Sequence, residues 1–331
     1  MKITHSSTVQ SLLLAAALGS GLGFVSLVSA QQVSSYIVDS NGKGLTELGT
    51  LGGGGSLAYD INDAGQVVGW STAEVMGPGH AFITGPDGVR MTALGRLGSG
   101  SSYASGINDA GQVVGSSDTA TGWRHAFITG PNGVGMTDLG TLGPLESYAS
   151  GINSTGQVVG ESVTAAYYWH AFITGPNGVG MTDLGTLGGA YSSALGINDA
   201  GRVVGRSDTA TGDSHAFITG PNGAGMTDLG TLGGDSSYAL GINDAGQVVG
   251  WSHTAAGDQH AFITGPNGVG MTDLNSLVSP PGGDFLTAAT WINNHGQVAA
   301  IGNPIPEPET YAMLLAGLGL LGFIAHRRKT A

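Results

Sequence analysis

The chain repeats the segment His215-Ala216-Phe217-Ile218-Thr219-Gly220-Pro221 five times, at a constant interval of 45 residues. The five copies start at His80, His125, His170, His215 and His260. A fixed period between about 20 and 50 residues is typical of solenoids, propellers and other repeat arrays. A residue that recurs in register is expected to serve the fold, because a catalytic group is needed once. We therefore predict that each histidine makes a buried hydrogen bond within its own repeat and that none binds a metal ion.

One repeat, residues 199–243, contains four short segments that are typical of β-strands. These segments are residues 202–207, 215–219, 225–229 and 237–243. Gly220-Pro221-Asn222-Gly223 predicts a tight turn, because proline fixes φ and Asn-Gly accepts positive φ. No stretch has the 3.6-residue period of a long amphipathic helix. Four strands in such a repeat correspond to one blade of a β-propeller.

The repeat region begins and ends with half a repeat. Its Ile-Asn hairpin occurs six times, at Asn62, Asn108, Asn153, Asn198, Asn243 and Asn293. Residues 34–49 align without gaps to residues 215–230, and residues 289–301 form the complementary half. Pairing of these halves would close a ring and hide its edge strands. We therefore predict an all-β fold, a six-bladed β-propeller; an open array or a sandwich is the alternative.

The composition argues against several classes of partner and cofactor. The net charge is −13, and residues 31–305 contain 6 Lys and Arg against 21 Asp and Glu. Such a surface repels phosphate backbones, so we expect no nucleic-acid partner. The chain has no cysteine, which excludes disulfides and thiolate metal sites. Gly52-Gly53-Gly54-Gly55 lacks the Lys-Ser/Thr of a phosphate-binding loop, and the Asn-Asp-Ala-Gly turns are too poor in oxygen ligands to favour Ca²⁺. We expect no cofactor.

The N-terminal residues 1–30 have the three parts of a secretory signal peptide. Lys2 gives the positive start, residues 11–27 are mostly apolar, and Val28-Ser29-Ala30 supplies small residues. We predict cleavage by signal peptidase between Ala30 and Gln31, with a retained N-terminal anchor as the alternative. The repeat domain then occupies residues 31–302.

The C-terminal residues 303–331 combine a short motif, an apolar stretch and a basic end. Pro306-Glu307-Pro308 precedes the apolar residues 310–325, and Arg327, Arg328 and Lys329 follow. As a transmembrane helix, residues 310–325 would span about 24 Å, against a bilayer core of about 30 Å. The basic end would stay in the cytoplasm and leave the body of the protein outside. A plain anchor that is never cut is the alternative.

Two of these patterns resemble known families. The repeat, with Asn-Asp-x-Gly-Gln-Val-Val-Gly, His-Ala-Phe and Met-Thr-Asp-Leu-Gly-Thr-Leu-Gly-Gly, resembles the HAF repeat of bacterial extracellular proteins. That resemblance implies a secreted β-repeat protein without known catalytic activity. The C-terminal segment resembles the PEP-CTERM sorting signal, which implies recognition by exosortase in the inner membrane of a Gram-negative bacterium. The expected location is first an inner-membrane precursor and then the cell surface or extracellular matrix.

Residues that vary between repeats are the candidates for binding. The variable connections are residues 71–79, 116–124, 161–169, 207–214 and 252–259. They carry Trp123 and Arg124 in one copy and Tyr167, Tyr168 and Trp169 in the next, which we predict to form a ligand patch on one face. Packing of these aromatic residues between blades is the alternative.

We expect a non-enzymatic surface or matrix protein that binds or organises extracellular polysaccharide. A structural or protein-binding propeller without a glycan ligand is a second hypothesis. A hydrolase or lyase that uses the central cleft is a third, but its candidate acids, Glu74, Glu146 and Glu161, are scattered and show no pairing pattern.

Overall fold

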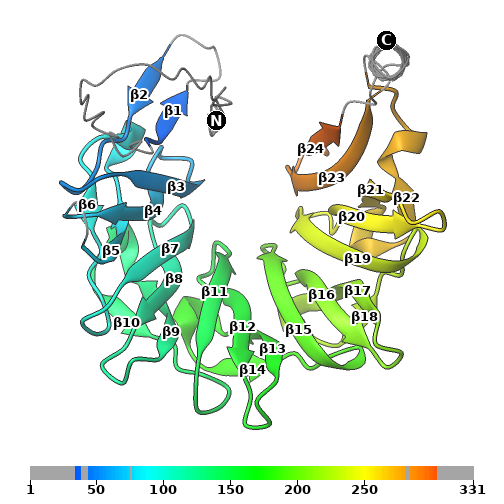
Figure 1. Cartoon of the computed structure of the whole chain (residues 1–331), viewed down its shortest axis with the longest axis horizontal. Coiled ribbons are helices and arrows are strands. Elements are labelled where there is room, and N and C mark those ends of the chain that lie inside the picture. Colours follow the sequence, from blue (N-terminus) through cyan, green and yellow to red (C-terminus); the bar gives the residue numbers. More distant parts are fainter. Residues whose placement is uncertain (1–33, 39–43, 75–76, 281–283, 304–331) are drawn as a thin grey trace, which may run out of the picture.

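The structure, a computed structural model, describes residues 34–38, 44–74, 77–280 and 284–303. This part of the chain is all-β apart from short 3-10 turns, and its sheets follow one another around an open arc (Figure 1). The predicted signal peptide, its cleavage site at Ala30 and Gln31, and the whole C-terminal signal with residues 310–325 lie outside the described residues. Within them, the structure has no helix with the length and hydrophobicity of a membrane span.

Five units each contain four antiparallel strands. Unit 1 comprises β3 (Ser56–Ile61), β4 (Val67–Thr72), β5 (Gly79–Ile83) and β6 (Thr92–Ala93). Unit 2 comprises β7 (Ser102–Ile107), β8 (Val113–Asp118), β9 (Arg124–Thr129) and β10 (Met136–Asp138). Unit 3 comprises β11 (Ser147–Ile152), β12 (Val158–Val163), β13 (Trp169–Thr174) and β14 (Met181–Asp183). Unit 4 comprises β15 (Gly188–Ile197), β16 (Val203–Thr209), β17 (Ser214–Thr219) and β18 (Met226–Asp228). Unit 5 comprises β19 (Gly233–Ile242), β20 (Val248–Thr254), β21 (Gln259–Thr264) and β22 (Met271–Asp273).

Two half-units flank the five complete ones. The N-terminal hairpin is β1 (Tyr36–Val38) and β2 (Leu45–Glu47), and the C-terminal hairpin is β23 (Phe285–Ile292) and β24 (Val298–Asn303). The 3-10 turns are η1 (Pro86–Gly88), η2 (Pro131–Gly133), η3 (Pro176–Gly178), η4 (Pro221–Gly223), η5 (Pro266–Gly268) and η6 (Leu274–Ser276). The four strands predicted for residues 199–243 are confirmed.

The tight turns have the backbone geometry that their sequence predicts. Asn222 has φ 53° and Gly223 has φ 74°, a left-handed conformation that asparagine and glycine adopt at low cost. The amide of Gly223 donates to the carbonyl of Gly201 at 3.0 Å, which joins the Gly-Pro-Asn-Gly turn to the Asn-Asp-Ala-Gly turn of the same unit. Both turns therefore lie at the same rim of the arc.

Successive units pack face to face through constant side chains. The interface between units 3 and 4 contains Val159, Ala171, Ile173, Ala194, Val203 and Phe217. Because neighbouring residues of a strand point to opposite faces, Val203 contacts unit 3 while Val204 contacts unit 5. Phe217 is fully buried, and burial of such a side chain contributes about 1.5–3 kcal/mol. The repeated Val-Val and Phe thus form the inter-unit core.

A ladder of asparagine side chains also joins the units. The Nδ2 of Asn62 donates to the carbonyl of Asn108 in the next unit. The same bond recurs through Asn153, Asn198 and Asn243 to Asn293, with distances of 3.0–3.2 Å. The Ile-Asn motif is therefore an inter-unit connection as well as part of a hairpin turn.

The predicted closure of the ring is wrong for this structure. Among the described residues, β1 pairs only with β2 and β23 only with β24, so residues 34–49 and 289–301 do not form a sixth sheet. The two hairpins lie on opposite sides of the opening (Figure 1). Each is held by its own neighbour: Ile37 and Leu48 pack on unit 1, and Ala289 and Ile292 pack on unit 5. The repeat pattern did not give the angle between successive units, on which closure depends.

Candidate ligand-binding face

The connections that vary between repeats lie at the end of the strands opposite to the tight turns. In units 2 to 5, they join the second and third strands, as residues 119–123, 164–168, 210–213 and 255–258. We call this end the variable rim. The predicted patch residues all lie in these connections or at the start of the third strand.

Two of the predicted patch residues meet at Tyr148. The ring of Trp169 lies 5.6 Å from that of Tyr148, measured between centroids. The guanidinium of Arg124, in unit 2, lies 4.9 Å from the ring of Tyr103 and 6.0 Å from that of Tyr148 in unit 3. Arg124 also donates from Nε to Asp118 Oδ1 at 2.8 Å. The structure therefore brings Arg124 and Trp169 together through a tyrosine that the sequence analysis did not select.

The other predicted residues are more exposed. Tyr168 makes an edge-to-face contact with Tyr191 of unit 4 at 5.7 Å between centroids. Trp123 is 44% exposed, and Tyr167 is 67% exposed with φ 65°. In the described part of the chain, Trp123 and Tyr167 have no aromatic neighbour, so the predicted patch is only partly assembled.

Similar contacts occur between units 1 and 2 and between units 4 and 5. Trp70 of unit 1 stacks on Tyr103 of unit 2 at 6.1 Å. Arg206 of unit 4 lies over Tyr238 of unit 5 and donates to its hydroxyl at 2.9 Å. Tyr238 in turn stacks on Trp251 at 4.3 Å. We call the resulting set the aromatic stripe: Trp70, Tyr103, Arg124, Tyr148, Trp169, Tyr191, Arg206, Tyr238 and Trp251.

A signal for the missed residues was present in the sequence. The residue after Val-Val-Gly is Trp70, Ser116, Glu161, Arg206 or Trp251, although its flanking residues are nearly constant. This position pairs across the sheet with the equally variable Leu57, Tyr103, Tyr148, Ser193 or Tyr238. Variation inside a strand, and not only in connections, therefore marks the candidate site.

A groove opens from the stripe between units 3 and 4. It has a volume of about 460 Å³ and is lined by Glu161, Trp169, Tyr191, Ser192, Ser193, Arg206 and Asp208. Aromatic faces, carboxylates, hydroxyls and a guanidinium thus surround one space. Flat rings can cover the apolar face of a ligand, while the polar groups fix its orientation.

Electrostatics keep the centre of the stripe in one protonation state at neutral pH. Burial opposes ionisation of Asp118, but hydrogen bonds from Arg124 and the Ser101 amide outweigh it and hold the pKa of Asp118 below its usual range. Burial and the neighbouring carboxylate of Glu146 raise the pKa of Tyr148. Tyr148 therefore remains a neutral phenol beside the Arg124–Asp118 ion pair.

Four of the five repeat histidines pair with an aspartate of their own unit. The Nδ1 atoms of His125, His170, His215 and His260 lie 2.7–2.9 Å from Asp138, Asp183, Asp228 and Asp273. The bond is within the unit, as expected, but it is at the surface and not buried: the His170 side chain is 20% exposed and that of Asp183 41%. In unit 1, Ala93 replaces the aspartate opposite Phe82, and His80 lacks this pair. No cluster of three or more potential metal-ligating side chains occurs among the described residues.

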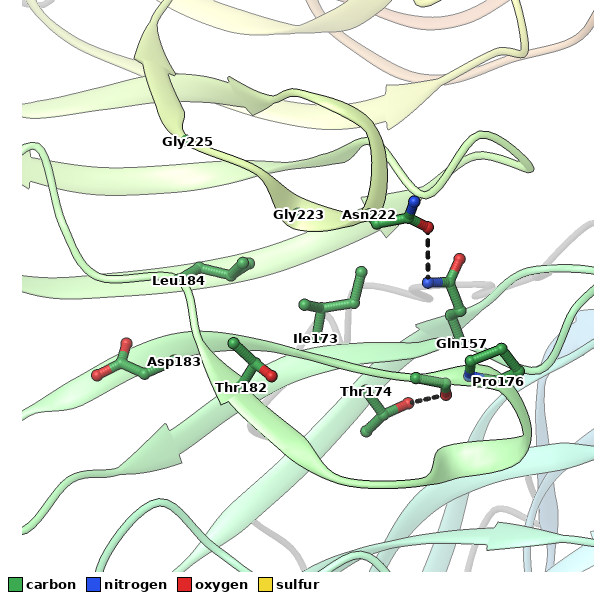
Figure 2. Close-up of a pocket in the computed structure, with 11 residues that line it drawn as sticks. Gln157, Ile173, Thr174, Pro176, Thr182, Asp183, Leu184, Asn222, Gly223 and Gly225 are labelled. Carbon is green, nitrogen blue, oxygen red and sulfur yellow. Dashed lines mark hydrogen bonds between the residues drawn. The ribbon is translucent and has the colours of Figure 1, made fainter.

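A second groove, at the opposite rim, is built from constant residues. It also lies between units 3 and 4, with a volume of about 410 Å³, and Figure 2 shows Gln157 reaching across it to Asn222. The Gln157 Nε2 to Asn222 Oδ1 distance is 3.2 Å, and Gln112 makes the equivalent bond to Asn177. Because its polar groups join neighbouring units, this groove is best explained by repeat packing.

Comparison with known proteins gives one sequence match and several structural ones. The C-terminal residues 304–329 match the PEP-CTERM protein-sorting motif. This motif supports export, anchoring through the C-terminus and processing as an exosortase substrate. No curated protein matches the chain.

The structural matches indicate a propeller-like fold. A TolB structure from Agrobacterium tumefaciens has a TM-score of 0.51 at 13% identity, covering 82% of this chain and 98% of that one. An oligogalacturonate lyase in complex with manganese has a TM-score of 0.50 at 12% identity, covering 83% and 84%. TolB from Acinetobacter baumannii has a TM-score of 0.48 at 11% identity, covering 71% of this chain, which spans 57% of that protein. At these identities, the likeness concerns the fold alone.

Proposed function

We propose that this protein is an exported, exosortase-processed protein without catalytic activity, which binds extracellular polysaccharide through the aromatic stripe. The sorting motif supports the export and processing steps. The likeness of its repeats to the HAF repeats of bacterial extracellular proteins supports the same location, at the cell surface or in the matrix of a Gram-negative bacterium.

The aromatic stripe is the observation that carries the binding proposal. Ring–ring and ring–guanidinium contacts connect units 1 to 3 and units 4 to 5. Between these two parts lies the groove lined by Trp169, Tyr191 and Arg206. Sugar rings present a C–H face that stacks on aromatic rings and hydroxyls that pair with carboxylates and guanidinium groups. A long stripe of such groups suits an extended polymer better than a small molecule. The same contacts also stabilise neighbouring units, so the test must separate binding from folding.

Two exposed tyrosines allow this separation. Tyr191 lines the groove and Tyr168 contacts it, and the two side chains are 49% and 45% exposed. The double substitution Tyr168→Ala/Tyr191→Ala therefore removes this aromatic pair from the groove with little loss of core. The matched control is Tyr59→Ala/Trp291→Ala, at positions that are 53% and 60% exposed outside the stripe. Binding of the full chain to polysaccharide isolated from the producer's matrix is measured by calorimetry. Aromatic anchors contribute at least about 2 kcal/mol each when they dominate an interface.

We expect the groove variant to bind at least about 30-fold more weakly and the control to bind like the wild type. Both variants should melt at the wild-type temperature. Equal affinities of the two variants would contradict the proposal, as would shortening of the polysaccharide by the wild-type chain, which would indicate a hydrolase or lyase.

The processing step has its own test. Replacement of Pro306, Glu307 and Pro308 by alanine should leave export unchanged and cause the precursor to accumulate in the inner membrane. The deciding measurement is the intact mass of the wild-type protein recovered from the cell surface. A mass that still includes Ala331 would contradict processing and favour a plain anchor.

A further inference from the structure

The N-terminal hairpin is the second half of a unit in structure as well as in sequence. Tyr36 pairs with Glu47, just as Phe217 pairs with Asp228 in unit 4. The amide of Leu48 donates to the carbonyl of Ser35 at 3.0 Å, and Leu229 makes the equivalent bond in unit 4 at 2.9 Å. β1 therefore corresponds to the third strand of a unit, and the described part of its half-unit contains no second strand with which it could pair.

The C-terminal hairpin is the corresponding first half. The Asn293 amide donates to the carbonyl of Gln297 at 3.0 Å, as Asn243 does to Gln247 in unit 5 at 3.1 Å. β24 therefore occupies the place of a second strand. In every complete unit, that strand pairs with the third strand along its other edge.

The N-terminal hairpin carries a residue that is missing from the interface of unit 5 with β23. The C-terminal hairpin carries one that is missing from the interface of β1 with unit 1. In the complete interfaces, one unit contributes the second valine of Val-Val and the next contributes the phenylalanine of its third strand, as Val204 and Phe262 do. Among the described residues, the interface of unit 5 with β23 contains no such phenylalanine, and that of β1 with unit 1 contains no such valine. Tyr36 and Ala299 stand at those two positions in the repeat alignment.

The edge of β24 is also exposed where a complete unit is buried. Residues 299–303 are exposed, and Ile301 is 52% exposed, whereas Val248, Val249 and Gly250 of unit 5 are buried. A strand edge with unpaired backbone groups is a template for pairing with another strand. The aligned register places Ala300 of β24 opposite Tyr36 of β1, by analogy with Gly250 and Phe262.

We propose that β24 of one copy pairs with β1 of a second copy, so that the protein associates head to tail and completes a four-stranded unit at each junction. Pairing within one chain would require the two hairpins to cross the opening of the arc, although each is fixed on its own neighbour (Figure 1). Pairing with a second copy leaves every packed interface intact. A head-to-tail contact is heterologous, so it extends into a filament unless its rotation closes a ring.

Engineered cysteines test this pairing directly, because the chain has none of its own. Full chains with either Ala300→Cys or Tyr36→Cys are mixed in mild detergent and oxidised. Cross-strand partners have Cβ atoms about 4.5–5.5 Å apart, so a small approach of the strands allows the Cβ separation of about 3.5–4.5 Å in a disulfide. We expect a disulfide-linked heterodimer from this mixture and a ladder of oligomers from the double variant. The out-of-register control, Gly302→Cys mixed with Tyr36→Cys, should give at least 10-fold less heterodimer.

A second measurement does not depend on the cysteine variants. The mass of the wild-type full chain in sedimentation should rise with concentration, and Ala299→Asp, at an exposed position, should keep it at that of the monomer. A double cysteine variant that forms only an internal disulfide would overturn the proposal in favour of ring closure. Absence of the heterodimer, or a wild-type mass that is independent of concentration, would also overturn it.

Discussion

Ala93 is the position at which unit 1 departs from the histidine–aspartate pairing of the other units. It pairs with Phe82 as Asp138 pairs with Phe127, so its side chain occupies the place of the missing carboxylate. Burial, with a smaller effect of the Arg96 charge, lowers the pKa of His80 below its usual value. Unit 1 therefore lacks the anionic partner that would oppose this shift.

Restoring the carboxylate should reverse this effect. In Ala93→Asp, we expect the pKa of His80 to rise, because the charged imidazole gains an anionic partner. A raised folded-state pKa of histidine stabilises the protein at low pH, and this stability is lost as the pH rises through that pKa. The gain should not exceed about 1 kcal/mol at pH 5, since the pair is at the surface. NMR titration of His80 and melting at pH 5 and pH 8 measure both effects; an unchanged pKa would contradict the assigned pairing, and Ala93→Asn is the uncharged control.

Asp60 is a second position at which unit 1 differs from the other units, because units 2 to 5 have glycine there. Its two carboxylate oxygens accept hydrogen bonds from the amides of Ile61 and Ile107, both at 2.9 Å. Burial raises the pKa of Asp60 above the ordinary value of 3.8, although these two bonds oppose the shift. The folded state therefore retains its proton at a pH where the unfolded chain has lost it.

This shift predicts a pH dependence with a definite sign. The Asp60 contribution to the free energy of unfolding should fall as the pH rises from about 3.8 through the raised pKa, because folding binds a proton in that window. Asp60→Gly, which restores the glycine of the other units, should remove this contribution. Chemical denaturation of both proteins between pH 3 and pH 7 gives the difference. If the wild type instead gains free energy of unfolding relative to Asp60→Gly as the pH rises, hydrogen bonding outweighs burial and the assigned shift is wrong.

At the scale of strands and turns, the sequence predicted most of what the structure contains. The turn at Gly220-Pro221-Asn222-Gly223 and the strand alternation of Val203 and Val204 follow from local chemistry alone. The aspartate partner of each histidine was not identified, because it depends on the register between the third and fourth strands. The aromatic stripe was found only in part, since Tyr148 and Arg206 lie within strands that were interpreted as structural.

The asparagine ladder gives a prediction for the junction between units. Asn153 is 4% exposed and donates to Gln157 Oε1 and to the Asn198 carbonyl, while it accepts from the Gln157 amide. Asn153→Ala should lower the free energy of unfolding by about 2–3 kcal/mol, since buried partners are left unpaired. Asn293 lies at the exposed end of the ladder, and its side chain bonds only within its own hairpin, so it serves as the control. Asn293→Ala should cost about 1 kcal/mol or less; equal losses in urea denaturation would contradict an inter-unit role.

At the scale of the whole molecule, the order of the repeats could be predicted, but neither the count of six blades nor the closure of a ring is confirmed. The half-repeats at residues 34–49 and 289–301 define which strands are present. Whether their ends meet depends on the angle between successive units, which the repeat pattern does not specify. The C-terminal sorting motif, in contrast, is readable from the sequence because it is a linear motif.

If the aromatic stripe binds an extended polysaccharide along five units, the affinity must depend on the length of the ligand. Oligosaccharides of increasing length are prepared from the matrix polysaccharide, and the Kd of each for the full chain is measured by calorimetry. Because longer oligomers contact more of the stripe, we predict affinity to rise by at least about 10-fold, or about 1.4 kcal/mol, for each further unit engaged, and then to level off. Tyr168→Ala/Tyr191→Ala should interrupt this rise at the groove between units 3 and 4. An affinity that is independent of length, or no binding at any length, would contradict the claim.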